Sequence, residues 1–195
     1  MGPGLRITAS LLRLRLAGWG ATPPSADRRA ELLAQLGAVA QATQKTSLRI
    51  RWLLARAEFL EPDEGVVAAR EAASLALAKG MHGLRISAEV LLARALVGAG
   101  DAVAALPRVR IALALAETYQ PDFVYAGEIG QAAHQVLTLN GESGDAVLRN
   151  TVDWIQQTAR HVPAEFRDSF MHRNPVNRDL LAAASRLGSG GGLLR

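Results

Sequence analysis

The chain has 195 residues, of which 49% are hydrophobic and only 5% are aromatic. Alanine and leucine supply most of the apolar side chains, which favours closely packed helices over a sheet rich in β-branched and aromatic residues. The 22 basic and 18 acidic residues leave a net charge of +4, and the arginines are spread along the chain. This spread argues against a nucleic-acid interface, which needs a clustered basic patch.

Cysteine is absent, which excludes disulfides and thiolate metal sites. No stretch approaches the roughly 20 consecutive apolar residues that a membrane span requires. We therefore expect a cytoplasmic protein that does not insert into a membrane.

The first predicted helix covers residues 5–19, where apolar side chains recur at helical spacing. Arg13 and Arg15 interrupt what would be the hydrophobic region of a secretory signal. A mitochondrial presequence is an alternative, because no acidic residue precedes Asp27. We favour a helix that forms the second half of a repeat. The next helix has Ser25 as its cap, and its predicted buried face consists of Leu32, Leu36, Val39 and Ala40.

Residues 47–119 contain one helix-pair pattern twice. The sequence Leu-Leu-Ala-Arg-Ala occupies positions 53–57 and again 91–95, an offset of 38 residues. Each copy continues into a turn with Asp and Gly and then an alanine-rich amphipathic helix. In the first copy we predict a turn at 62–65 and a helix at 66–79.

The second copy has Gly100 and Asp101 in its turn, a residue tolerant of positive φ followed by a capping carboxylate. Pro107 lies too far into the following helix for its first turn. That helix therefore either starts late, near Ala104, or is kinked.

Beyond Pro121 we expect a helix capped by Asp122, a turn at 140–144, and a second helix that ends near His161. A helical turn or two follows at 164–171, and a last helix begins after Asn174 and runs to about residue 187. The predicted organisation is one helical domain over 1–188 and a flexible glycine-rich tail over 189–195.

The second copy also carries a family resemblance. Leu92-Ala93, Leu96, Gly100-Asp101, Ala105, Val109 and Ala112 follow the pattern of large and small residues in a tetratricopeptide (TPR) repeat, which the copy resembles. Glu89, Leu96 and Val109 stand where that family usually has aromatic residues. The resemblance implies an all-α, right-handed α-solenoid of about five antiparallel helix pairs.

Residues 162–170 and 174–181 resemble the C-terminal ends of tetratricopeptide arrays in large bacterial signalling ATPases, kinases, cyclases and transcriptional activators. In such proteins this end caps the array. The resemblance implies an alternative function, in which the chain is the C-terminal sensory or regulatory arm of a multidomain signalling ATPase, kinase or transcriptional activator and acts only in cis.

No catalytic, cofactor or metal site is predicted. None of the four histidines lies at the i, i+4 spacing of a helical metal site, and no phosphate-binding loop or nucleophile elbow occurs. We therefore expect a protein that is not an enzyme and has no cofactor.

A concave inner face is the candidate site, because stacked helix pairs leave the first helix of each pair along a groove. The repeat register places four residues of each copy there: Arg49, Trp52, Arg56 and Phe59, then Ser87, Val90, Arg94 and Val97. Arginines at matched positions could bind carboxylates, with aromatic residues as apolar anchors. For each residue taken singly, packing between helices or simple solvation is the favoured interpretation. The predicted function is a scaffold that binds a peptide or protein segment.

Overall fold

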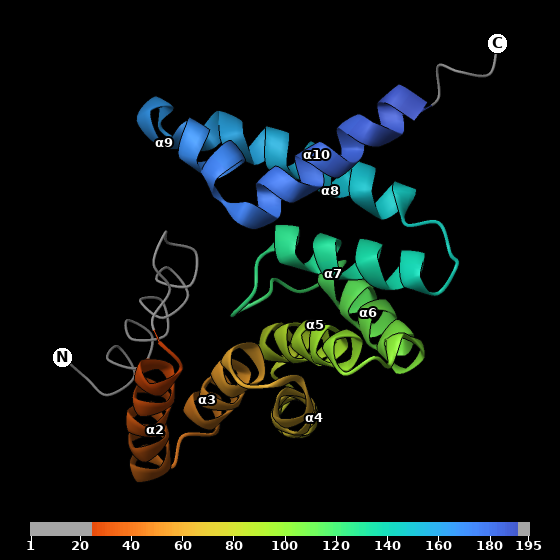
Figure 1. The fold of residues 1–195 in the computed structure, drawn as a ribbon. Helices are drawn as coiled ribbons and strands as arrows, with labels where there is room; N and C mark the ends of the chain where they lie inside the picture. Colours follow the sequence, from red (N-terminus) through yellow and green to blue (C-terminus); the bar gives the residue numbers. More distant parts are fainter. Residues whose placement is uncertain (1–24, 191–195) are drawn as a thin grey trace. The chain divides into compact units, whose positions relative to one another are not determined.

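The computed structural model describes residues 25–190, and all regular structure in that range is helical (Figure 1). The all-α prediction is confirmed for these residues. The helix predicted at 5–19 lies outside the described residues. The chain divides between Phe123 and Val124 into two compact units, each of which is described by itself below.

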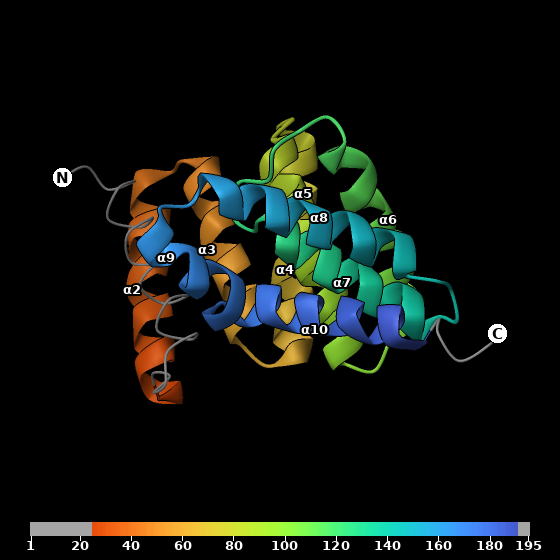
Figure 2. The ribbon, with the colours of Figure 1, turned by 90° about the horizontal axis from the view of Figure 1, so that it is seen from above.

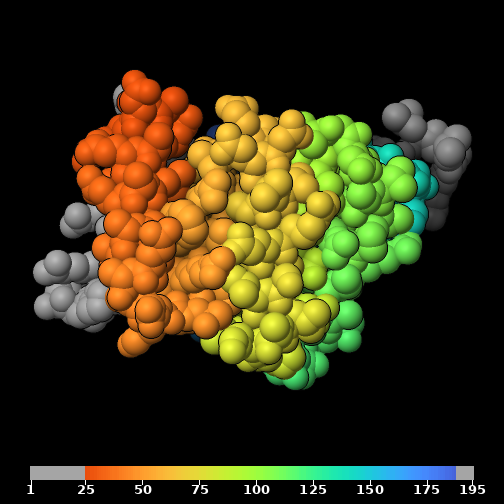
Figure 3. Space-filling view, turned by 90° about the horizontal axis from the view of Figure 1, so that it is seen from below, coloured from red at the N-terminus to blue at the C-terminus, as the bar shows by residue number. Residues whose placement is uncertain are grey.

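The first unit contains five described helices that follow one another through short connections. They are α2 (Ala26–Thr43), α3 (Thr46–Phe59), α4 (Pro62–Ala78), α5 (His82–Gly98) and α6 (Ala102–Ala116). Each helix packs against the next, and α3 also packs against α5, so the first helices of the two sequence copies are neighbours. Figure 3 shows these helices in chain order across one face, from red to green.

Small side chains on α4 explain why it fits between α3 and α5. Its buried residues are one glycine and five alanines: Gly65, Ala68, Ala69, Ala72, Ala73 and Ala76. Alanine keeps helix propensity high and adds little bulk, so neighbouring helices can approach closely. The larger apolar side chains come from α3 and α5, where Ile50, Leu53, Leu54, Ile86, Leu91 and Leu92 are essentially fully buried. Each contributes about 1.5–3 kcal/mol by leaving water.

Several predicted helix ends are confirmed. The Ser25 hydroxyl accepts a hydrogen bond from the Arg28 amide at 3.3 Å, and Asp101 Oδ1 accepts one from the Ala104 amide at 2.9 Å. Gly80 and Gly100 take φ values of 64° and 84° after α4 and α5. Only glycine adopts this left-handed backbone without strain.

In this unit one prediction is wrong, and one of the two alternatives offered for another helix is excluded. Residues 62–65 form the first turn of α4, because proline is well tolerated at the first helical position and Asp63 and Glu64 favour a helix N-terminus. Of the two alternatives for the helix that contains Pro107, the late start is excluded, since α6 begins at Ala102. The carbonyl of Val103 is the one deprived of an amide partner by this proline, and Val103 is 76% exposed, so water can satisfy it.

Asp122 is also not a helix cap. The next helix begins at Ala126, where Glu128 Oε2 accepts a hydrogen bond from the Tyr125 amide at 3.0 Å. Asp122 instead accepts two hydrogen bonds from Arg51 Nη2, at 2.6 and 2.8 Å. This ion pair ties the segment after α6 back to α3 within the first unit.

The second unit consists of α7 (Ala126–Leu139), α8 (Asp145–His161), α9 (Ala164–Asp168), a π-helical turn (Ser169–Arg173) and α10 (Pro175–Gly190). Figure 2 shows α7, α8 and α10 side by side, and each packs against the other two. Asn174 caps α10 as predicted, its Oδ1 accepting from the amides of Val176 and Asn177. The helix continues to Gly190 and so includes the start of the segment predicted as a tail.

Candidate partner-binding groove

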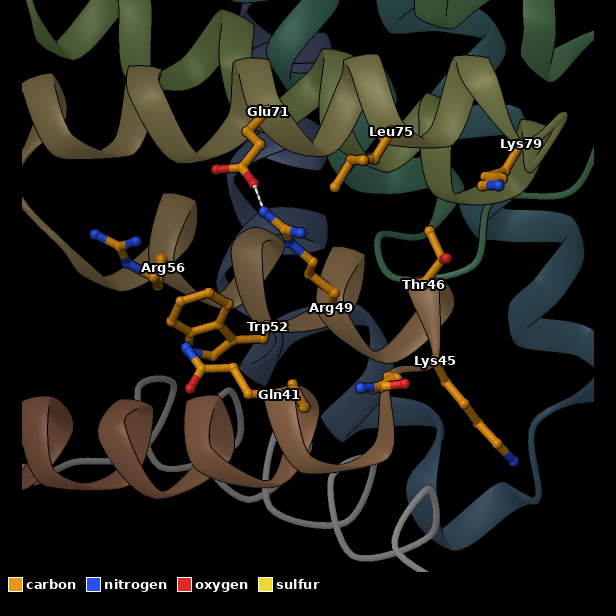
Figure 4. A pocket seen from close by; sticks show the side chains of 11 residues that line it. Gln41, Lys45, Thr46, Arg49, Trp52, Arg56, Glu71, Leu75 and Lys79 are labelled. Atoms are coloured by element: carbon orange, nitrogen blue, oxygen red, sulfur yellow. Dashed lines mark hydrogen bonds and ion pairs between the residues drawn. The ribbon is translucent and has the colours of Figure 1, made fainter.

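A groove of about 600 Å³ lies among α2, α3 and α4 in the first unit (Figure 4). We call it the α2–α4 groove. Its lining includes Lys45, which is the N-cap of α3, and Arg49, Trp52 and Arg56 within α3. Steps of three and four residues place the last three side chains on one face of the helix. These three residues belong to the face predicted from the repeat register.

The other two helices complete the groove. Glu71 and Leu75 of α4 and its C-cap Lys79 recur every four residues along the groove, and the end of α2 contributes Gln41 and its C-cap Gln44. In Figure 4 the acidic and apolar side chains of α4 point toward the arginine and tryptophan of α3. Both walls of the groove therefore combine charged and apolar side chains.

Trp52 is held in place by α2. Its Nε1 donates a hydrogen bond to the carbonyl oxygen of Leu33 at 3.0 Å. A Cβ atom at Gly37 would lie 2.9 Å from the same nitrogen, so the indole sits directly against the backbone of α2. The guanidinium of Arg56 lies 5.2 Å from the centroid of the indole ring, within cation–π range. Trp52 thus packs between α2 and α3 and also lines the groove.

The charges in the groove are unequal. Four basic residues, Lys45, Arg49, Arg56 and Lys79, line it together with one acidic residue, Glu71. Arg49 Nη2 lies 2.5 Å from Glu71 Oε1, and both side chains are substantially exposed. Arg56 lies at the limit of an ion pair, 4.0 Å, from Glu64 on the first turn of α4. The groove consequently presents an excess of positive charge to whatever enters it.

The other predicted residues lie elsewhere. Phe59 is half-buried against the apolar cluster that α2 forms with α3. Ser87 and Val90 are 0% and 1% exposed, so neither is accessible in this structure. The Ser87 hydroxyl donates to the Gly83 carbonyl and accepts from the Phe123 amide, both at 3.1 Å. The segment after α6 therefore covers this part of α5.

Arg94 and Val97, the last two residues of the predicted face, do not line the α2–α4 groove. Arg94 is exposed beside a smaller hollow of about 180 Å³ that Glu58, Leu60 and Pro62 also line, and Val97 is half-buried. The structure thus brings together the predicted residues of the first copy apart from Phe59, and does not join them to those of the second copy.

Comparisons with protein-family models, with curated proteins and with solved structures gave no match. Within residues 25–190, no three His, Cys, Asp or Glu side chains gather closely enough to hold a metal ion. No helix in the same range is long and apolar enough to cross a membrane. The chemistry of the groove itself therefore carries the functional argument.

The repeat register missed the contribution of α4 to this groove. It considered only the first helix of each pair, whereas Glu71 and Lys79 lie on a second helix. An acid, an apolar residue and a base at four-residue steps in the sequence mark a face with mixed chemistry. The sequence therefore contained a signal for this face, but it did not show which helix the face lies against.

Proposed function

We propose that this protein is a non-enzymatic interaction scaffold of the cytoplasm, with tetratricopeptide-like repeats, whose α2–α4 groove binds an extended, acidic segment of a partner protein. The observation that carries the proposal is that Lys45, Arg49, Arg56 and Lys79 line one groove together with Trp52. Charge complementarity therefore favours a ligand that brings carboxylates. The chain's own first 24 residues contain three arginines and no acid, so they lack the complementary charge.

The spacing along α3 supports an extended ligand. Lys45 and Arg49 are four residues apart, about 6 Å along the helix axis. Alternate side chains of an extended peptide lie on the same side and are about 6.6 Å apart. Two acids separated by one residue would thus face these two cations. A following apolar side chain would reach Trp52, which offers a rigid aromatic surface in the same groove as Leu75.

The test uses a capped, fluorescently labelled peptide, Glu-Ala-Glu-Ala-Leu-Ala-Glu, and its counterpart with glutamine in place of every glutamate. Fluorescence anisotropy with the full chain measures Kd for each. We expect the acidic peptide to bind and the glutamine peptide to bind at least tenfold more weakly, because the latter has no charge to pair with the groove.

A pair of double variants locates the binding. Arg49→Gln with Arg56→Gln removes two groove cations, and Arg70→Gln with Arg149→Gln removes two exposed arginines outside the groove. Both chains have the same net charge. Two lost contacts of about 0.7 kcal/mol each weaken binding about tenfold, and only the first variant should show this loss. Equal affinity in the two variants, or no binding of the acidic peptide to the unaltered chain, would refute the proposed function.

A further inference from the structure

Glu71 occupies the position in the α2–α4 groove that a partner's carboxylate would need. It projects from α4 across to α3, and its Oε1 lies 2.5 Å from Nη2 of Arg49. Among the described residues that line the groove, it is the one acidic side chain. Its neighbours at four-residue steps on α4, Val67 and Leu75, carry no charge.

We infer that Glu71 is an internal competitor, which holds Arg49 until a carboxylate of the bound segment displaces it. The inference rests on the proposed function and specifies how the same groove is regulated. Two carboxylates at one guanidinium repel each other, so a ligand that pairs with Arg49 gains most when Glu71 moves away. Glu71 is 40% exposed and Arg49 57% exposed, so water can solvate the released side chain.

The competitor has a consequence for selectivity. The Arg49–Glu71 pair is exposed, and breaking such a pair lowers an apparent affinity by about two- to fivefold. A segment without a carboxylate in register with Arg49 leaves the pair intact and does not bear this cost. Glu71 therefore lowers the affinity for segments that place an acid at Arg49 and leaves the affinity for other segments unchanged.

The experiment measures Kd of the same acidic peptide for Glu71→Gln in the full chain. Glutamine keeps the size of the side chain but removes the charge, so Arg49 becomes available without competition. We expect binding to tighten about two- to fivefold. Glu117→Gln is the matched control, because it removes one exposed negative charge at the end of α6 and leaves the groove lining unchanged. Its Kd should stay within experimental error of the unaltered chain.

A double-mutant cycle separates competition at Arg49 from a general charge effect. In a chain that already carries Arg49→Gln, the change Glu71→Gln should give no further tightening beyond that of the Glu117→Gln control. The same gain with and without Arg49 would overturn the inference, as would unchanged or weaker binding by Glu71→Gln alone. In those cases the acidic peptide still binds the unaltered chain and the proposed function stands. Failure of the peptide to bind any of these chains overturns both.

Discussion

The change Gly130→Ala tests how closely α7 and α8 approach in the second unit. An alanine in a helix interior is normally favoured over glycine by about 1 kcal/mol. At Gly130, however, an added Cβ would lie 2.0 Å from Oγ1, 2.5 Å from Cγ2 and 2.7 Å from Cβ of Thr151. All three distances are shorter than a van der Waals contact, so one of the helices must shift.

Thr151 cannot rotate out of the way. It is 8% exposed, and its hydroxyl donates a hydrogen bond to the Val147 carbonyl at 2.7 Å. Overpacking of this kind costs typically 1–3 kcal/mol, and three simultaneous overlaps place Gly130→Ala at the upper end. After the gain in helix propensity, the net destabilisation is about 2 kcal/mol.

Urea unfolding followed by circular dichroism measures this loss. With a typical slope of about 2 kcal/mol per molar, the midpoint should fall by about 1 M. The second change Thr151→Ala removes the two nearest atoms and should recover at least about 1 kcal/mol relative to the sum of the single changes. A rise of the midpoint in Gly130→Ala, as helix propensity alone predicts, would show that the two helices do not cross this closely.

Three further changes test single contacts by the same unfolding measurement. Trp52→Phe keeps an aromatic ring but removes the hydrogen bond to Leu33, so we expect a loss of about 1 kcal/mol, and an unaltered midpoint would contradict that contact. Asp101→Ala removes an N-cap and should cost about 1 kcal/mol, whereas Asp101→Asn, which can still cap, should cost much less. Asp122→Asn breaks the charge pairing with Arg51, and its cost in unfolding free energy, at most about 1 kcal/mol, should shrink in 1 M salt. A cost that does not depend on salt would show that the ion pair does not hold the segment after α6 in place.

Helix ends with a local cause could be predicted from the sequence. Ser25, Asp101 and Asn174 cap helices by bonding to amides two or three residues away, and Gly80 and Gly100 end them through their own backbone freedom. Such interactions involve only neighbours in the chain. Helix ends were predicted wrongly where one local sequence pattern is compatible with two structures. A proline followed by acidic residues suits a turn as well as the first turn of a helix, and Pro62 proved to be the second case.

The groove could be predicted only in part. The register of α3 correctly placed Arg49, Trp52 and Arg56 on one face, because three- and four-residue steps determine a helix face. The same register could not reveal that Ser87 is covered by the segment that reaches Phe123, since that contact joins residues 36 positions apart. It also could not pair Arg49 with Glu71, which follows it by 22 positions.

The amino-acid sequence by itself determined that this chain is helical, where most of its helices begin and end, and that the pattern of one helix pair occurs twice. These features follow from periodicity and from bonds between near neighbours. Only the tertiary structure decided which helix faces meet, and therefore that Trp52 packs on the backbone of α2 and that an acid of α4 lies beside an arginine of α3. Side chains that are distant in sequence meet through the packing of whole helices, and that packing depends on the shape of both surfaces at once.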